Sequence, residues 1–490
     1  MFPQRQASLP PRRSGLSDGH HPRGDRPGPA GHVARTCAQG HPMSPAETAS
    51  SRPCGPWLRI YRAASPVLCG AAGLGRPFSA KLATGLDGRR GLMDRLLAAA
   101  PDLQGCVWFH VTSVGEYEQA RPVIAALKGE FPAMPIAVTH YSPSGWEYAA
   151  KRPCADFHDY LPLDHPRDMR ALVAAWNPAL LVFVKFDCWP NQVLAADRAQ
   201  VPVILLAGSL QPGSARLKPV GRALYRDVFD RFAHLGVCTA EDGERFTRSM
   251  GVRCPVTVTG DTRGEQVILR FEAAAAGETS ARLRGLGGRI LVLGSTWPPD
   301  EKLWLPILPP LLDSYPDLRV VLTPHEPLPQ RLAELESVLD RAPIGHLRLS
   351  GLMAGDDPAA ARVILVDSIG RLAEIYRAGH LAYVGGSFTT GVHNTMEPAI
   401  AGMPVLFGPV IGNAEEAGRM VDLGVGFVLR TPAEALRTAG KLLANPATLN
   451  ELGAQARQVV LDQRGATEKS MALLRPHLAG RQGSPANPAP

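Results

Sequence analysis

The stretch "CVWFHVTSVGEYEQARPVIAALKGEFPAMPIAVTH" (residues 106–140) decides the fold class. It begins with a short apolar run, 106–111, continues with a helical pattern that contains "EQARPVIAALKGEF", and ends with a second apolar run, 135–140. Uninterrupted apolar runs are typical of strands buried on both faces, and a helix between two such runs is the usual connection of parallel strands. The stretch therefore predicts a strand, a helix and a second strand of a parallel sheet.

The same alternation extends along most of the chain. Further strands are predicted at "ALLVFV" (179–184), "VPVILLAG" (201–208), "HLGVCTA" and "PVTVTGD", and, after a break rich in Gly and Ala, at "RILVLGST", "LRVVLTPH", "RVILVD", "LAYVGGS" and "MPVLFGP". Two such series predict an α/β fold with two Rossmann-like domains facing each other across a cleft. The predicted division is a disordered N-terminal extension (1–56), a first domain (57–275), a linker (276–288), a second domain (289–479) and a disordered tail (480–490).

Composition places the chain among soluble globular proteins, with 45% hydrophobic and 20% charged residues in a length of 490. The net charge of +7 is concentrated near the N-terminus, because residues 57–100 alone hold seven Lys or Arg against two Asp. This distribution argues against a nucleic-acid-binding surface on the main domains. It favours contact between the segment 57–95 and an anionic membrane surface.

The eight cysteines include no CxxC pair, which predicts reduced, structural thiols and no zinc site. No stretch reaches the ~18 consecutive apolar residues that a membrane span needs. The segment Ala63–Leu74 fits either a helix lying on a membrane or an ordinary first helix packed on the protein. Met43 is an alternative start of the chain.

In parallel α/β sheets, ligands bind beyond the carboxyl ends of the strands, so the loops that follow the strands carry the candidate site. Glu116 follows the first strand and fits two roles: an acidic residue that complements a helix dipole, or a general base that deprotonates a hydroxyl. Lys185 and Asp187 follow a later strand and form either a surface salt bridge or a functional pair.

In the second half, "GGSFTTGVHNTMEPAIAGMPVLFGP" (385–409) is the most informative stretch. Gly385 and Gly386 let the backbone approach a ligand closely. Asn394 and Glu397 have the spacing of a capping box. The same spacing also fits a helix N-terminus that binds a phosphate, with Glu397 accepting hydrogen bonds from ribose hydroxyls.

Taken together, nine ordered motifs resemble the bacterial 3-deoxy-D-manno-octulosonic acid (Kdo) transferase family that acts on lipid A precursors. The motifs are "SVGEYEQARPVI", "SPSGWE", "LPLDHPRD", "FVKFDCWPN", "GDTR", "GSTWPPDE", "PHEP", "DSIGRL" and the stretch 385–409. The resemblance covers roughly residues 57–475. It implies the GT-B architecture of glycosyltransferases and transfer of Kdo from CMP-Kdo to the lipid A precursor lipid IVA in lipopolysaccharide biosynthesis. It also implies inversion at the anomeric carbon, no cofactor or metal, and peripheral attachment to the cytoplasmic face of the inner membrane.

The resemblance also assigns roles to individual residues. Glu116 matches the general base, Glu397 the ribose-binding carboxylate, and Asp187 a second catalytic carboxylate, with Lys185 beside it in the cleft. The nucleotide-phosphate loop comprises Gly385, Gly386, Ser387 and Asn394, and the other donor-binding positions are Ser295, Thr296, His325, Ile369, Gly370 and Asn413.

The chain departs from the family pattern in three places. It has Lys185 and Asp187 in "VKFDCWPN" where many members read "ETELWPN", it lacks the Arg of "PRHPER" in its "PHEP" motif, and it has Trp297 where His is frequent. Two alternatives to the Kdo transferase interpretation remain: a GT-B enzyme of other nucleotide-sugar specificity, and a catalytically silent nucleotide-binding protein.

Overall fold

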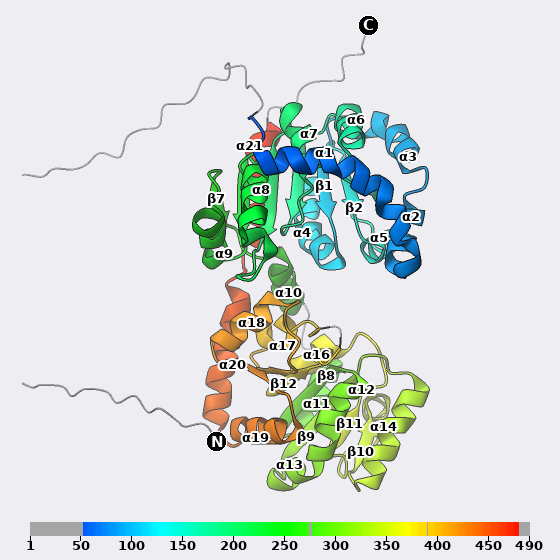
Figure 1. The fold of residues 1–490 in the computed structure, drawn as a ribbon. Coiled ribbons are helices and arrows are strands. Elements are labelled where there is room, and N and C mark those ends of the chain that lie inside the picture. The colour runs from blue at the N-terminus through cyan, green and yellow to red at the C-terminus, as the bar shows by residue number, and fades with distance from the viewer. Residues whose placement is uncertain (1–51, 274–276, 390, 480–490) are drawn as a thin grey trace, which may run out of the picture. The chain divides into compact units, whose positions relative to one another are not determined.

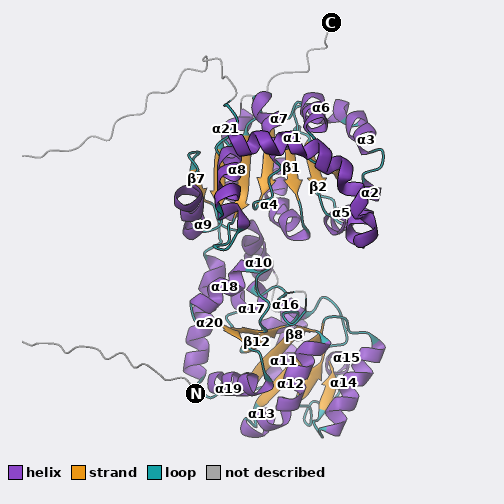
Figure 2. Cartoon of the chain, in the orientation of Figure 1, coloured by secondary structure: helices purple, strands orange, loops and turns teal. Residues whose placement is uncertain are grey.

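A computed structural model describes residues 52–273, 277–389 and 391–479 (Figure 1). The predictions for residues 1–51 and 480–490, including the alternative start at Met43, lie outside the described residues. Strands occupy the interior of each of two lobes and helices lie outside them (Figure 2). This arrangement confirms the predicted α/β fold class.

The first lobe is built on a seven-stranded parallel sheet in the order β3-β2-β1-β4-β5-β6-β7. Val107 of the first strand is in register with Ile136 on one side and with Leu180 on the other. The strands are β1 (Val107–Val111), β2 (Ile136–His140), β3 (Phe157–Tyr160), β4 (Leu180–Val184), β5 (Val203–Gly208), β6 (His234–Val237) and β7 (Val256–Val258).

Helices cover both faces of this sheet. One face packs against residues of α1, α3, α6, α7 and α8, and the other against residues of α4 and α5. Several of these helices begin at a proline in the first turn, where the missing N–H is not needed. The helices are α1 (Pro56–Ala71), α2 (Ala80–Gly88), α3 (Leu92–Ala98), α4 (Val114–Glu130), α5 (Pro143–Lys151), α6 (Pro166–Trp176), α7 (Pro190–Arg198), α8 (Pro219–Phe229) and α9 (Ala240–Glu244).

The second lobe repeats the plan with the order β10-β11-β9-β8-β12-β13-β14, again all parallel. Its strands are β8 (Arg289–Thr296), β9 (Leu318–Pro324), β10 (His346–Arg348), β11 (Val363–Leu365), β12 (Leu381–Val384), β13 (Val405–Phe407) and β14 (Gly426–Val428). Its helices are α11 (Glu278–Gly285), α12 (Pro298–Trp304), α13 (Leu308–Ser314), α14 (Pro329–Arg341), α15 (Leu349–Ala354), α16 (Leu372–Tyr376), α17 (Met396–Ile400), α18 (Glu415–Asp422), α19 (Pro432–Leu443) and α20 (Pro446–Leu461).

The chain crosses between the lobes twice. The first crossing uses α10 (Thr262–Ala273), which contacts α4 of the first lobe and α17 and α20 of the second. The second uses α21 (Ala466–Leu478), which buries Met471, Leu474 and Leu478 in the core of the first lobe. The crossings are joined by Glu265, whose carboxylate accepts hydrogen bonds from the Gly465 and Thr467 amides at 2.7 and 2.6 Å.

These contacts differ from the predicted domain bounds. The range 276–288, predicted as a linker, contains α11, and Leu283 of that helix is buried in the core of the second lobe. The range 289–479, predicted as one domain, ends with α21, which packs on the first lobe. At the N-terminal end, residues 52–55 are held against the first lobe, since the Gly55 amide donates to Asp227 at 2.6 Å and Arg231 donates to the Arg52 carbonyl at 3.0 Å.

Candidate functional site

In each sheet the order in which the chain adds strands reverses direction at one point. This point lies between β1 and β4 in the first sheet and between β8 and β12 in the second. At such a switch point the loops after the two strands run in opposite directions and leave room for a ligand. The predicted residues Glu116, Lys185 and Gly385 lie in or just after these loops, and Ser295 is the penultimate residue of β8.

Glu116 lies in the first turn of α4, directly beyond the carboxyl end of β1. The hydroxyl of Ser113 caps this helix and accepts a hydrogen bond from the Glu116 amide at 3.3 Å. The Glu116 carboxylate turns back and accepts a hydrogen bond from the amide of Thr112. The side chain is therefore fixed by the helix start, and only 4% of the residue is exposed.

Burial, together with the negative charge of Asp187, raises the pKa of Glu116 to about 7. The Thr112 amide and the ammonium of Lys185 oppose this shift. A carboxyl group with a pKa near the working pH is suited to general base catalysis, because it is ionised often enough to accept a proton and basic enough to keep it. Glu116 therefore lies in the first helical turn, as predicted, and its acidity suits a base, while its role as the general base stays a prediction.

The loop after β4 places Lys185 and Asp187 on the same side as Glu116. Asp187 forms an ion pair with Arg216 at 2.6 Å, and the Arg216 guanidinium also stacks over the ring of Phe186, 4.6 Å from its centroid. Asp187 is thus held by a cation from a different segment. Its predicted role as a second catalytic carboxylate stays a prediction.

In the second lobe, the glycines of the stretch 385–409 serve the fold. A Cβ on Gly385 would lie 2.3 Å from the carbonyl oxygen of Ser295, so only glycine allows the two loops to approach. The amide of Gly385 donates to the Gly294 carbonyl at 2.9 Å, and the amide of Gly386 donates to the Asp300 carboxylate at 3.0 Å. These two amides were predicted to hold the nucleotide phosphate, but in this structure both are already satisfied within the protein.

Two predicted hydroxyls are likewise used inside the lobe. Ser387 is fully buried and accepts a hydrogen bond from the Gly408 amide at 2.6 Å. Thr296 is buried and donates to Glu301 at 3.2 Å. Both hydroxyls therefore form hydrogen bonds within the second lobe.

Asp300, which the sequence did not single out, explains this arrangement. It is completely buried and accepts hydrogen bonds from the Tyr383 hydroxyl and from the amides of Trp297 and Gly386. The Asp300 carboxylate therefore connects three segments: the loop after β8, strand β12, and the loop after β12 that contains Gly386. The only sequence signal was its position three residues after Trp297, which suits a helix cap.

The Asn394–Glu397 pair differs in detail from the predicted capping box. The Asn394 carbonyl oxygen accepts from the amide of Met396 at 3.0 Å, and its amide donates to the Glu397 carboxylate at 3.1 Å. Thr395 is the N-cap residue, and α17 is five residues long. Burial raises the pKa of Glu397, while Asn394 and the positive charge of Arg270 lower it. No other hydrogen bond reaches the Glu397 carboxylate from the residues that the structure describes, so one of its oxygens is open to a ligand.

Three aromatic rings form a cluster at the carboxyl ends of β8, β9 and β12. The indole N–H of Trp297 donates to His393 at 2.9 Å, and the ring of His325 stacks on both, with centroid distances of 4.6 Å.

Ile369, in the loop after β11, is 86% exposed, and Gly370 beside it has φ +86°. The sequence predicted His325, Ile369 and Gly370 but missed His393, whose partners come from separate loops.

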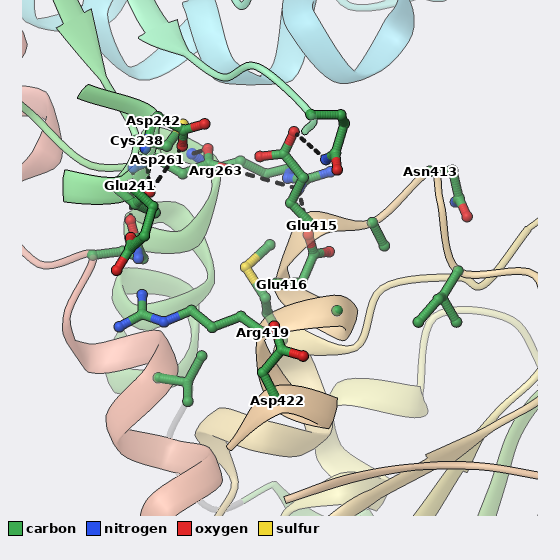
Figure 3. A pocket seen from close by; sticks show the side chains of 18 of the residues that line it. Cys238, Glu241, Asp242, Asp261, Arg263, Asn413, Glu415, Glu416, Arg419 and Asp422 are labelled. Carbon is green, nitrogen blue, oxygen red and sulfur yellow. Dashed lines mark hydrogen bonds and ion pairs between the residues drawn. The ribbon is translucent and has the colours of Figure 1, made fainter. Parts of the chain in front are cut away.

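A cavity of about 610 Å³ is lined by residues of both lobes (Figure 3). The predicted residues Lys185 and Asn413 line it, and so do Gln119 of α4 and Met396, which is adjacent to Glu397. Glu116 and Glu397 are not among the lining residues. The cavity therefore lies beside the predicted catalytic and ribose-binding carboxylates, and the two carboxyl groups do not meet in it.

The cavity contains contacts between the lobes that the sequence did not indicate. Glu415, at the start of α18, accepts hydrogen bonds from Ser209 and, at 3.0 Å, from Gln211 in the loop after β5. Arg263 forms an ion pair with Glu416 at 3.1 Å. These pairs connect residues that are about 150 to 200 positions apart in the sequence. The local sequence around each residue does not predict such contacts.

Two further observations concern the described residues alone. No group of three or more His, Cys, Asp or Glu side chains in ranges 52–273, 277–389 and 391–479 has an arrangement that could hold a metal ion. Among the same residues, no helix is long and apolar enough to cross a membrane.

The sequence of this chain is similar to one family model and to several known proteins. Residues 84–266 match the family model described as 3-deoxy-D-manno-octulosonic-acid transferase (kdotransferase). A 3-deoxy-D-manno-octulosonic acid transferase of Chlamydophila psittaci is 31% identical over 342 residues, which cover 66% of this chain and 74% of the relative. The enzyme of the same name from Bordetella pertussis is 30% identical, with 79% and 90% covered.

Among solved structures, the UDP-GlcNAc 2-epimerase of Neisseria meningitidis superimposes with a TM-score of 0.52. The match covers 75% of this chain and 99% of the epimerase, at 14% sequence identity. At that identity the similarity concerns the fold alone, which is the two-lobed GT-B architecture.

Proposed function

Because this chain belongs to the 3-deoxy-D-manno-octulosonic acid transferase family and is therefore a glycosyltransferase, we propose that it moves Kdo from CMP-Kdo to a sugar hydroxyl of a lipid A precursor, lipid IVA. The observation that carries the proposal is Glu116: a buried carboxyl with a pKa of about 7, fixed at the carboxyl end of β1 where the sheet order reverses. No metal ion is part of the proposed step.

In the proposed step, Glu116 accepts the proton of the acceptor hydroxyl. The freed oxygen forms a bond to the anomeric carbon of Kdo, and the bond from that carbon to the CMP phosphate oxygen breaks, so that CMP leaves with the bonding electrons. A single displacement of this kind inverts the anomeric configuration and needs one base. A double displacement would need a second, nucleophilic group, and Asp187, the second carboxylate predicted for the site, is paired with Arg216.

Incubation of the protein with CMP-Kdo and a tetra-acylated lipid A precursor, followed by mass spectrometry of the lipid, tests the proposal. A lipid carrying one or more additional Kdo residues is expected. Transfer only in a parallel incubation with UDP-sugars would support the GT-B enzyme of other specificity. CMP binding without release of CMP from CMP-Kdo would support the catalytically silent protein.

The pH dependence gives a second test. The pKa of the Glu116 carboxyl is raised to about 7, and the base must be ionised to act, so kcat/KM is expected to rise with pH through about 7 and then level off. The measurement is kcat/KM for transfer between pH 5.5 and 8.5. A rate that is already constant from pH 5.5 upward would contradict a base of this acidity.

A lipid acceptor requires that the first lobe reach a membrane, and we propose that the segment from α1 to α2 does so at the cytoplasmic face of the inner membrane. Helix α1 packs on α6, α7 and α8, while Val67 and Leu68 point to solvent. The turn η1 (Ala72–Phe78) that follows exposes Leu74 by 78% and Phe78 by 89%. Exposed apolar side chains next to cations such as Lys81 are typical of a surface that lies in the lipid headgroup layer. The helix packs on the protein, as one of the two predictions for the segment 63–74 had it, and contact of its exposed side with a membrane is the proposal made here.

Replacement of Leu74 and Phe78 by glutamate is expected to reduce binding to vesicles that contain anionic phospholipid at least ~10-fold, because two large apolar side chains lose their burial in lipid. Sedimentation with vesicles measures the bound fraction. The control is the double variant Leu328→Glu and Leu423→Glu, which changes two exposed apolar residues of the second lobe. Equal loss in both variants would mean that charge alone weakens binding and that the α1–α2 segment is not the contact.

A further inference from the structure

Lys185 occupies an unusual backbone position at the switch point of the first sheet. It follows the last residue of β4, its amide still donates to the Leu206 carbonyl of β5 at 2.8 Å, and its φ is +73°. A residue with a Cβ pays a conformational penalty in this left-handed region, and such positions are concentrated at functional sites. Because glycine would avoid the strain, the lysine side chain is the feature that requires explanation.

The charges around the cavity show what distinguishes Lys185. Four cations line the cavity: Lys185, Arg245, Arg263 and Arg419. The three arginines are in ion pairs, with Asp242 at 2.8 Å, Glu416 at 3.1 Å and Asp462 at 3.1 Å. Within the part of the chain that the structure describes, Lys185 has no carboxylate partner and no hydrogen bond from its ammonium group. Six carboxylates line the same cavity, but among the described residues none of them forms an ion pair with Lys185. The Lys185 ammonium lies 5.5 Å from the centroid of the Phe186 ring.

The position of Lys185 relative to Glu116 indicates which ligand group it meets. Its charge acts on the Glu116 carboxyl, so the ammonium lies on the side of the crevice where the proposed base lies. An octulosonic acid bears its carboxylate directly on the anomeric carbon. When that carbon approaches the acceptor oxygen and the base, the sugar carboxylate must lie near Glu116, and two carboxylates at close range repel each other unless a cation lies with them.

We propose that the ammonium of Lys185 pairs with the carboxylate of the sugar acid that is transferred, which makes Lys185 a residue that selects the donor. This inference rests on the proposed function, because it takes the donor to be a nucleotide-linked sugar acid. Asp187 does not compete for the ammonium, since Arg216 holds it.

The test compares CMP with CMP-Kdo, which carries the sugar acid on its phosphate. The affinities of CMP and CMP-Kdo are measured by calorimetry in the Glu116→Gln background, which prevents turnover, with and without Lys185→Met. We expect Lys185→Met to weaken CMP-Kdo binding ~10- to 100-fold, as for loss of a charged hydrogen bond, and to leave CMP binding within twofold. Lys185→Arg should restore most of the loss, and Lys441→Met, which removes an exposed lysine of α19, should change neither affinity.

Each outcome decides the inference. If Lys185→Met weakens the binding of CMP and of CMP-Kdo by the same factor, Lys185 contacts the nucleotide phosphate and the inference is wrong. Unchanged affinity for both ligands would also overturn the inference. If the wild-type site binds CMP-Kdo no better than CMP, no pairing with the sugar acid exists. Selective loss of CMP-Kdo binding in a protein that transfers nothing to the lipid would support the role of Lys185 while refuting the proposed acceptor, so the two failures are distinguishable.

Discussion

Replacement of Glu116 by glutamine is expected to lower kcat for Kdo transfer ~10²- to 10⁴-fold, which is the usual contribution of a positioned general base. Glutamine keeps the shape of the side chain, and its carbonyl oxygen can still accept the hydrogen bond from the Thr112 amide. Only the ability to take a proton is removed. CMP affinity is expected to stay within twofold, because the nucleotide contacts are proposed in the second lobe. Steady-state transfer assays and calorimetry measure the two quantities.

The matched control is Glu118→Gln, two residues further along α4. Glu118 pairs with Arg121 at 2.9 Å and accepts a hydrogen bond from Tyr148 at 3.0 Å, and it does not line the cavity. Its replacement is expected to change kcat less than threefold. If Glu116→Gln retains near-normal turnover, or if both variants lose activity to the same extent, Glu116 is not the base.

A stability measurement separates loss of the base from loss of the fold. The folded-state pKa of Glu116 is raised to about 7, whereas an unfolded glutamate titrates near ~4.3. Ionisation of this carboxyl therefore destabilises the wild-type protein progressively as pH rises from ~4.3 to about 7, by at most ~4 kcal/mol. Glu116→Gln lacks this cost, so at pH 8 it is expected to be at least as resistant to denaturant as the wild type.

Sequence patterns identified the central strands because those strands are buried on both faces and read as unbroken apolar runs. The edge strands β3, β10 and β14 were missed, because β3 has polar positions in "FHDY" and β10 and β14 are only three residues long. The helix α11 was missed because its segment, "ETSARLRG", has few apolar positions from which a helical period can be recognised.

The candidate site was predictable where one residue and its local element determine the chemistry. Glu116 follows from its place between a strand end and a helix start. The use of the Gly385 and Gly386 amides was not predictable, because their acceptors, Gly294 and Asp300, are distant in the sequence. The return of α21 to the first lobe was missed for the same reason: its apolar face gives no indication of which lobe it covers.

Replacement of Glu397 by glutamine is expected to weaken CMP binding ~10- to 100-fold, because a hydrogen bond to a charged acceptor is worth more than one to a neutral amide. The Glu397 carboxylate is oriented by Asn394 at 3.1 Å and has an oxygen that the described residues leave open. Burial raises the pKa of this carboxyl, as expected for a group that lacks its full set of partners until a ligand arrives. Calorimetry with CMP measures the loss, and Glu451→Gln on the exposed side of α20 is the control.

The role in ribose binding, as opposed to a general effect on the loop, is tested by a second nucleotide. If Glu397 accepts hydrogen bonds from the ribose hydroxyls, removal of the 2′-hydroxyl and removal of the carboxylate charge eliminate the same interaction, and their effects are not additive. The wild type is then expected to bind 2′-deoxy-CMP more weakly than CMP, whereas Glu397→Gln should discriminate between them less. Full additivity of the two changes would show that Glu397 supports the loop after β12 without touching the sugar, and the assignment of the ribose to this carboxylate would fall.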